Sequence, residues 1–442
     1  MSKLKYIIGI IFILFGLVFN ESNLRNYFST YAIMGLDRRI PILLIDFIFI
    51  VLGIIILLIK SDLLTFEKIT KYYKVSAITV LSMLLLFIFA NVFVYSISII
   101  KDIIVYKNQI FSIYSEPFTS LYSNLNRKQV DDLLRETWSR PYVYEPFTQF
   151  KERPYKGKYV NVNEHGFRPV KDQGPWPPVL DNYNIFLFGG STTFNYGLSD
   201  DQTTAEYLQR YFSDAKLNKK VFIYNFGRGN YYSTQERILF EKLLTAGLSP
   251  NLAIFIDGLN DFYYINDEPQ YTEKIRDFVD NGGNLLNKIP FVKAVKSFKM
   301  IFTNGSKSVF KNENYNDQVI ITKVINRYLL NKKLIEAVSS HFAVKTLFIW
   351  QPVPTYKYDL KYHKPARCGF GKFTYSKYGY PRMAEYIKKV SLGNNFLWLA
   401  DMQKNLKQPL YVDIDHYSGE MSEKIAKRIY DYLINDIMKD KL

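Results

Sequence analysis

Four short stretches of this 442-residue chain carry side chains that could together perform acyl-ester chemistry. They are Phe-Gly-Gly-Ser-Thr-Thr at 188–193, Asn-Phe-Gly-Arg-Gly-Asn at 225–230, Gly-Leu-Asn-Asp at 258–261 and Asp-Ile-Asp-His at 413–416. Between them they offer a hydroxyl nucleophile, backbone N–H donors, a side-chain amide and a carboxylate–imidazole pair, which are the groups such chemistry uses. Any one stretch alone would be weak evidence.

Ser191 is the candidate nucleophile. It follows an apolar run and two glycines, which permit the tight turn that presents a side chain at the start of a helix. The first N–H groups of a helix have no partner inside it, so they are available to a developing oxyanion. The competing interpretation is an ordinary serine N-cap after a strand.

His416 is the candidate base, because a serine needs a group to remove its proton and that group needs a partner to fix its tautomer. Of four histidines, it is the one near the C terminus with an aspartate three residues earlier, Asp413. Asp415 is adjacent and remains an alternative partner. The competing interpretation is an exposed loop histidine beside acidic residues.

Asn260 follows the third apolar run and could donate its side-chain amide to an oxyanion. The stretch 225–230 follows the second run and could add a backbone N–H. Turns between strands and helices are commonly rich in Gly, Asn and Asp, so a purely structural role is the alternative for both stretches.

These residues need a scaffold, and the pattern after residue 180 predicts one. Strand and helix signals alternate, which indicates a parallel sheet with helices on both faces and a site at the carboxyl ends of the strands. The strands are expected at 183–188, 220–224, 252–256, 346–350 and 395–399, and the helices at 203–212, 234–246, 323–338 and 420–434. An insert is expected at about 262–322.

Three apolar runs at about 6–19, 41–59 and 75–100 predict transmembrane helices, the last of them comfortably long. The first could instead be a signal peptide, although Asn20-Glu-Ser22 is not a small-residue cleavage site. Asp46 interrupts the second run. Positive charge before the first run and between the second and third favours a multi-pass protein whose catalytic domain is periplasmic or extracellular. The charges are those of Lys3, Lys5, Lys60, Lys68, Lys71 and Lys74.

A polar connector, residues 106–180, joins the membrane region 1–105 to the domain 181–442 and contains Asn-Glu-His-Gly-Phe-Arg at 163–168. The formal net charge is +16, but its lysines and arginines are scattered, so we expect no nucleic-acid partner and favour the membrane surface or an acidic polysaccharide. Cys368 is the single cysteine, which excludes an intrachain disulfide. No Cys/His cluster or phosphate-loop motif occurs, and we expect neither a metal nor a cofactor.

Taken together, the four motifs resemble the SGNH hydrolase family, also called GDSL-type esterases, over roughly 182–434. The resemblance implies a flavodoxin-like three-layer α/β/α fold, with Ser191 as nucleophile, His416 as base and acid, and Asp413 as its orienting carboxylate. It also implies an oxyanion hole of the Ser191 N–H, the Asn260 amide and a loop N–H, which we assign to Gly229. Gly190 departs from the usual Gly-Asp-Ser, and Asn230 stands where the second block usually ends in glycine.

The leading hypothesis is a membrane-anchored serine ester hydrolase that removes acyl, chiefly acetyl, groups from a cell-envelope glycan or lipid. An O-acyltransferase using the same triad is the alternative, and it would require a membrane partner that supplies the acyl group. A non-catalytic glycan-binding or assembly module is the third. The complete set of Ser, Asn, Asp and His argues against it.

Overall fold

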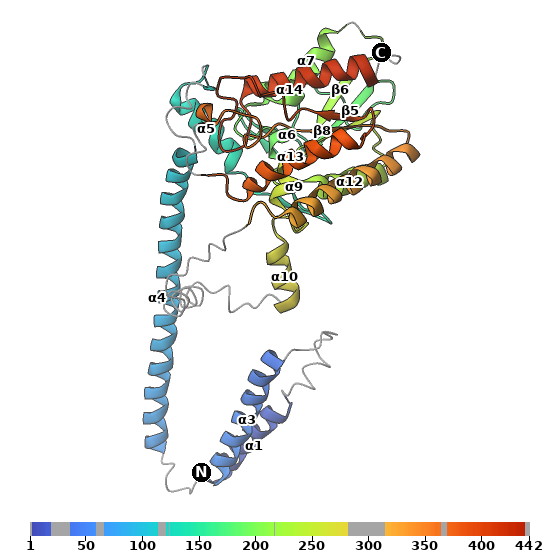
Figure 1. Ribbon diagram of the computed structural model, residues 1–442. Coiled ribbons are helices and arrows are strands. Elements are labelled where there is room, and N and C mark those ends of the chain that lie inside the picture. The colour runs from blue at the N-terminus through green and yellow to red at the C-terminus, as the bar shows by residue number, and fades with distance from the viewer. Residues whose placement is uncertain are drawn as a thin grey trace. The chain divides into compact units, whose positions relative to one another are not determined.

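The computed structural model describes residues 2–18, 36–58, 66–113, 121–122, 124–215, 217–281, 314–363 and 369–437 (Figure 1). It divides into two compact units, Met1–Ser96 and Ile97–Leu442. The helices of the N-terminal part are α1 (Ser2–Val18), α3 (Leu36–Leu58) and α4 (Phe66–Ile113).

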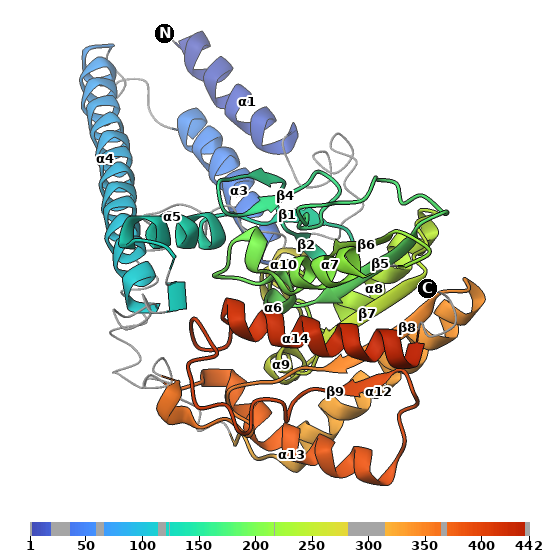
Figure 2. The same cartoon turned by 90° about the horizontal axis from the view of Figure 1, so that it is seen from above.

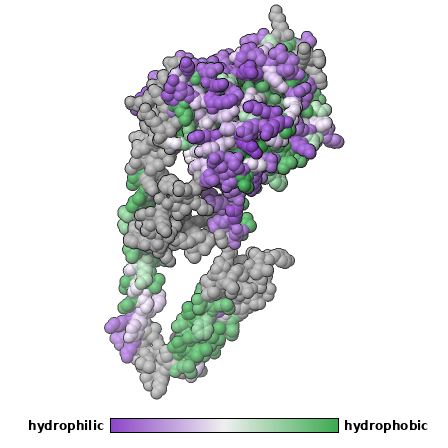
Figure 3. All heavy atoms as spheres, in the orientation of Figure 1, coloured by the Kyte–Doolittle hydropathy of each residue, from purple (hydrophilic) through white to green (hydrophobic). Residues whose placement is uncertain are grey.

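Helices α1 and α3 pack closely because glycines lie where they meet. A Cβ on Gly53 would lie 2.7 Å from the Gly9 carbonyl oxygen, and one on Gly16 would lie 2.8 Å from the carbonyl oxygen of Asp46. Phe49 of α3 contacts Phe12 and Phe15 of α1. Small residues allow this close approach in apolar helix pairs. Many large apolar side chains of both helices are exposed, and they gather on the face that Figure 3 shows.

Helices occur at all three predicted apolar runs. By length and composition, one stretch, Thr70–Ile100 of α4, is long and apolar enough to cross a membrane. Tyr6–Val18 and Leu43–Leu58 are apolar but shorter. A multi-pass arrangement and its orientation therefore stay predictions.

A five-stranded parallel sheet forms the centre of the larger unit, as predicted. Its strands, in chain order, are β5 (Tyr183–Gly189), β6 (Val221–Asn225), β7 (Leu252–Asp257), β8 (Lys345–Trp350) and β9 (Phe396–Trp398). They lie in the order β6-β5-β7-β8-β9, and every neighbouring pair is parallel. This is the flavodoxin-like order, which places the carboxyl ends of the strands at one edge.

Helices cover both faces of the sheet, so the fold has three layers (Figures 1 and 2). Helices α7 (Thr204–Asp214) and α14 (Gly419–Tyr432) pack on one face, and α8 (Ser233–Thr245) and α12 (Gln318–His341) on the other. Alternate side chains of a strand point to opposite faces. Ile185 and Leu187 accordingly join the core under α7 and α14, whereas Phe186 and Phe188 join the core under α8.

The remaining elements were not predicted individually. Near the carboxyl edge of the sheet lie the short helices α6 (Ser191–Phe194), η3 (Asp200–Gln202) and α9 (Leu259–Tyr263). The insert contributes α10 (Thr272–Asn281), and its residues 282–313 lie outside the described ones. Further along the chain are η5 (Leu360–Tyr362), η7 (Gly371–Phe373), α13 (Thr374–Lys389) and a π-helical turn, η8 (Leu433–Ile437).

The segment that the sequence predicted as a connector is folded and packs against the site. It contains α5 (Arg127–Trp138) and two antiparallel hairpins, β1 (Val143–Glu145) with β2 (Gln149–Lys151), and β3 (Tyr155–Lys156) with β4 (Asn161–Val162). Leu133, Leu134 and Val160 share one buried cluster with Phe194 and Val412. The segment therefore belongs to the same compact unit as the sheet.

Candidate active site

Ser191 lies at the carboxyl edge of the sheet, where β5 ends and α6 begins. A Cβ on Gly189 would lie 2.0 Å from the Thr193 side-chain oxygen, so only glycine fits in this turn. Ser191 is 9% exposed and is the first residue of α6. Its N–H therefore has no acceptor within the helix and remains available to a substrate oxygen.

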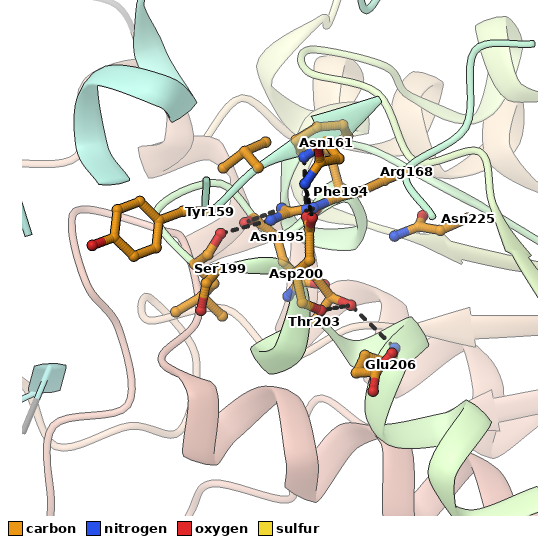
Figure 4. A network of polar contacts seen from close by, with 12 residues as sticks. Tyr159, Asn161, Arg168, Phe194, Asn195, Ser199, Asp200, Thr203, Glu206 and Asn225 are labelled. Atoms are coloured by element: carbon orange, nitrogen blue, oxygen red, sulfur yellow. Dashed lines mark hydrogen bonds and ion pairs between the residues drawn. The ribbon is translucent and has the colours of Figure 1, made fainter. Parts of the chain in front are cut away.

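Arg168 and Asn225 hold the other end of α6, and the network around Arg168 is drawn in Figure 4. The Arg168 guanidinium donates to the carbonyl oxygens of Phe194 (2.7 Å) and Asn195 (3.0 Å), and to that of Leu198 at 2.7 Å. Its Nε forms a 2.8 Å ion pair with Asp200, and the Asn225 amide donates to the Thr193 carbonyl at 3.1 Å. A buried arginine thus fixes a four-residue helix that could not be stable alone.

The structure brings His416 and Asp413 together as the sequence predicted. Nδ1 of His416 lies 2.7 Å from Oδ2 of Asp413, and the His416 N–H donates to Asp413 Oδ1 at 2.8 Å. Asp415 also approaches Nδ1, at 3.3 Å. Burial lowers the pKa of His416, but the charges of Asp413 and Asp415 outweigh it and raise this pKa to about 9. Both carboxylates therefore stabilise the imidazolium.

Two aromatic rings flank the imidazole of His416. Tyr196 is stacked on it at 5.6 Å between ring centroids, and Trp138 packs edge-on at 5.5 Å. Nε2 of His416 is buried and has no hydrogen-bond partner among the described residues. The nitrogen opposite the carboxylates is therefore free to exchange a proton with a substrate or with Ser191.

A shared acceptor ties the Ser191 turn to the His416 loop. Oε1 of Gln351 accepts from the hydroxyl of Thr192 at 2.8 Å and from that of Tyr417 at 3.1 Å. These are the residues that directly follow Ser191 and His416. The described residues include no hydrogen bond between Ser191 and His416 themselves, and such bonds are often long before a substrate binds.

Asn260 lies beside the same turn. A Cβ on Gly190 would come within 2.3 Å of its Nδ2, and this nitrogen donates to the Tyr231 carbonyl oxygen at 2.7 Å. The amide carries a second N–H, which it can offer to an oxyanion.

The assignment of a loop donor to Gly229 is not supported, because its N–H donates to Oε1 of Glu152 at 2.9 Å. The next residue, Asn230, has a left-handed backbone (φ 62°). Asparagine tolerates this conformation better than other residues with a side chain. No acceptor for the Asn230 N–H occurs among the described residues. Asn230, rather than Gly229, is the available donor of this loop.

Among the described residues, one group has the spacing of metal ligands: it consists of Asp413, Asp415 and His416. Each offers one ligand atom, and these atoms all lie within 4.8 Å of one another. Both carboxylates converge on Nδ1, which is how a catalytic imidazole is oriented. Nε2 of His416 would be available either to a metal ion or for proton transfer. We interpret the group as an acid–base unit because Gln351 ties its loop to the Ser191 turn.

Sequence reasoning missed Trp138, Glu152, Tyr196 and Gln351. Trp138, Glu152 and Gln351 lie 39 to 160 residues from Ser191 in the chain. Tyr196 is close to Ser191 in the chain, but it belongs to no recognisable motif. The Asn-Glu-His-Gly-Phe-Arg stretch was noticed without a role. The structure shows that its last residue, Arg168, anchors α6.

In comparisons with known proteins, no family model matches the chain, and no curated protein does. Among solved structures, it is similar to the acetyl xylan esterase AlAXEase, with 11% identity, 57% of this chain and 100% of that chain covered, and a TM-score of 0.32. It is also similar to a G-D-S-L lipolytic family member from Veillonella parvula DSM 2008, with 10% identity, 58% of this chain and 98% of that chain covered, and a TM-score of 0.31. A third similar structure is the esterase EstA from Pseudoalteromonas sp., with 12% identity, 58% of this chain and 98% of that chain covered, and a TM-score of 0.29. Over this part, the chain is thus similar to solved proteins of the G-D-S-L family and other esterases.

Proposed function

We propose that the protein is a serine ester hydrolase of the SGNH type that works through an acyl-enzyme. One observation carries the proposal: an imidazole oriented by Asp413 keeps a buried, unpartnered Nε2 in the loop that Gln351 ties to the Ser191 turn. Nucleophilic catalysis by serine needs an oriented imidazole whose second nitrogen is free to accept the serine proton.

In the proposed reaction, Ser191 Oγ attacks the ester carbonyl carbon while His416 Nε2 accepts the serine proton. The oxyanion that forms accepts hydrogen bonds from the N–H groups of Ser191 and Asn230 and from the Asn260 amide. The ester C–O bond then breaks, and the alcohol leaves with the proton from His416. Water repeats the sequence, releases the acid and restores the serine hydroxyl.

We propose an acyl ester of a cell-envelope glycan or lipid as the substrate, with an acetyl group as the first candidate. The apolar stretch Thr70–Ile100 supports a membrane anchor. The lysines before 6–19 and between the second and third apolar runs support a catalytic domain outside the cytoplasm. These assignments rest on the sequence motifs and on this charge distribution.

An acyltransferase is the second candidate, and the burial of the site favours it. Ser191 is 9% exposed and His416 is 5% exposed. A site that excludes water protects an acyl-enzyme from hydrolysis until another hydroxyl, such as one of a sugar, attacks. A separate membrane partner would then supply the acyl group.

The test uses the full chain in detergent, with Ser191→Ala and, as a matched control, Ser213→Ala on the exposed side of α7. Fluorophosphonate labelling reports the nucleophile, and p-nitrophenyl acetate turnover reports transfer to water. Both signals should vanish in Ser191→Ala only. Labelling with little turnover would favour the transferase, whereas a folded wild-type protein with neither signal would refute the serine mechanism.

A further inference from the structure

Glu152 is a buried carboxylate that lies outside the sheet yet reaches the candidate site. It follows β2 and is 1% exposed. Its Oε2 forms an ion pair with Arg140 at 3.1 Å. Its Oε1 accepts from the Tyr196 hydroxyl at 2.7 Å and from the Gly229 N–H at 2.9 Å. Both oxygens are thereby satisfied, as a buried charge requires.

The two partners of Oε1 contact or adjoin two different parts of the proposed machinery, the base His416 and the oxyanion donor Asn230. Tyr196 carries the ring that is stacked on His416, with 19° between the ring planes. Gly229 directly precedes Asn230, whose N–H is the free donor of the loop. One carboxylate oxygen therefore fixes both the tyrosine that stacks on the base and the backbone next to an oxyanion donor.

A chain of hydroxyl and amide groups closes this connection. The Asn230 amide donates to the Tyr142 hydroxyl at 3.2 Å, which lies 3.1 Å from the Tyr196 hydroxyl. Burial and the Glu152 charge raise the pKa of Tyr196 well above its ordinary value, so this hydroxyl stays a donor. A Cβ on Gly229 would lie 2.1 Å from the Tyr142 oxygen and 2.5 Å from that of Tyr196, so a side chain here would displace both.

We propose that Glu152 is a positioning residue that aligns His416, through Tyr196, with the oxyanion donor at Asn230; this inference rests on the proposed function. The contrary view is that Glu152 merely neutralises Arg140 and stabilises the fold. The two views differ in what they assign to the hydroxyl of Tyr196, which takes no part in the ion pair.

The experiment measures kcat, KM and the fluorophosphonate labelling rate per folded molecule for full-length Tyr196→Phe, Glu152→Gln and Glu152→Ala. Tyr224→Phe is the matched control, because it also loses a buried tyrosine hydroxyl, one that donates to Pro175 at 2.7 Å. Folded fractions come from circular dichroism melts, and rates are taken well below the melting temperature.

Tyr196→Phe keeps the stacked ring but frees it from Glu152, so kcat should fall about tenfold while KM stays within about twofold. Glu152→Gln keeps an oxygen acceptor and should retain kcat within about threefold, whereas Glu152→Ala should lose about a hundredfold. The control should keep the wild-type kcat.

Wild-type rates per folded molecule in Tyr196→Phe and Glu152→Ala would overturn the positioning role while leaving the serine mechanism intact. Equal losses in Glu152→Gln and Glu152→Ala, with Tyr196→Phe unchanged, would assign Glu152 to the ion pair alone. A folded wild-type protein that neither turns over substrate nor reacts with the fluorophosphonate would instead refute the proposed function, and the inference with it.

Discussion

Gly190 faces the side-chain amide of Asn260 so closely that residue 190 has no room for a side chain. A Cβ there would lie 2.3 Å from Nδ2 of Asn260 and 2.9 Å from the carbonyl oxygen to which this nitrogen donates. An aspartate at position 190, as in the Gly-Asp-Ser pattern, would therefore clash with Asn260 where it lies in this structure.

We expect Gly190→Ala to lower kcat/KM about a hundredfold, because the new methyl group displaces the Asn260 amide from its place beside Ser191. Asn260→Ala, which deletes the donor outright, should cost on the order of 10²- to 10³-fold. Steady-state turnover of p-nitrophenyl acetate measures both. The double variant should be little worse than Asn260→Ala, and fully additive losses would contradict a shared cause.

The pH–rate profile should have an acid limb near pH 9, because burial and two opposing carboxylates leave the pKa of His416 at about 9 and the base must be neutral. Asp415→Asn removes one of the charges that favour the imidazolium, so the limb should move down by about one pH unit. Asp413→Asn should instead reduce kcat about a thousandfold or more by releasing the imidazole. An unmoved limb in Asp415→Asn would show that its charge does not act on His416.

His363 should make the protein sensitive to acid. It donates from Nε2 to the Ile414 carbonyl at 2.9 Å, and burial lowers its pKa to about 4. Between that value and the ordinary 6.5, the unfolded chain binds the proton and the folded one does not, so stability falls as pH drops through this window.

The loss at pH 4 should be as much as about 3 kcal/mol of unfolding free energy. His363→Gln, which cannot titrate, should lose less stability on acidification than the wild type. Melting temperatures between pH 4 and 7.5 give the comparison. Parallel curves for the two proteins would mean that His363 does not keep its neutral form.

Arg168→Met should lower the unfolding free energy by about 3–5 kcal/mol, because it removes the buried partner of Asp200 and leaves three carbonyl oxygens without their donor. Arg168→Lys keeps the charge but not the fork of donors, so it should recover only part of the loss. Arg135→Met, which breaks an exposed pair with Asp131 (2.9 Å), should cost about 0–1 kcal/mol. Urea unfolding followed by tryptophan fluorescence separates the three variants.

The sheet could be predicted to within a residue or two because its central strands are predominantly apolar. All residues of β5 and β7 are buried, so continuous apolar runs marked them without any need for alternation. Helix α13 was missed because Pro381 lies inside it. A proline removes one hydrogen bond and usually ends a helix, but here tertiary packing of Tyr380 and Met383 supports the turn.

The site residues within motifs were predictable, and their supports were not. Ser191, His416 and Asn260 follow or precede regular elements at recognisable spacings. Glu152 has no such signal, since its partners come from three separate segments. The sequence could not separate Gly229 from Asn230 as the donor of the 225–230 loop, because the choice depends on Glu152, which accepts the Gly229 N–H from a distant segment.

The packing of the segment before the sheet also limits how the protein can be shortened. Trp138 contacts His416, and Arg140 and Arg168 lie over the Phe194 ring, with their guanidinium carbons 4.9 and 4.8 Å from its centroid. A fragment that began at residue 181 would expose one wall of the candidate site. A soluble version suited to inhibitor screening or crystallisation should instead begin before Tyr122, whose hydroxyl donates to the Gly197 carbonyl at 2.9 Å.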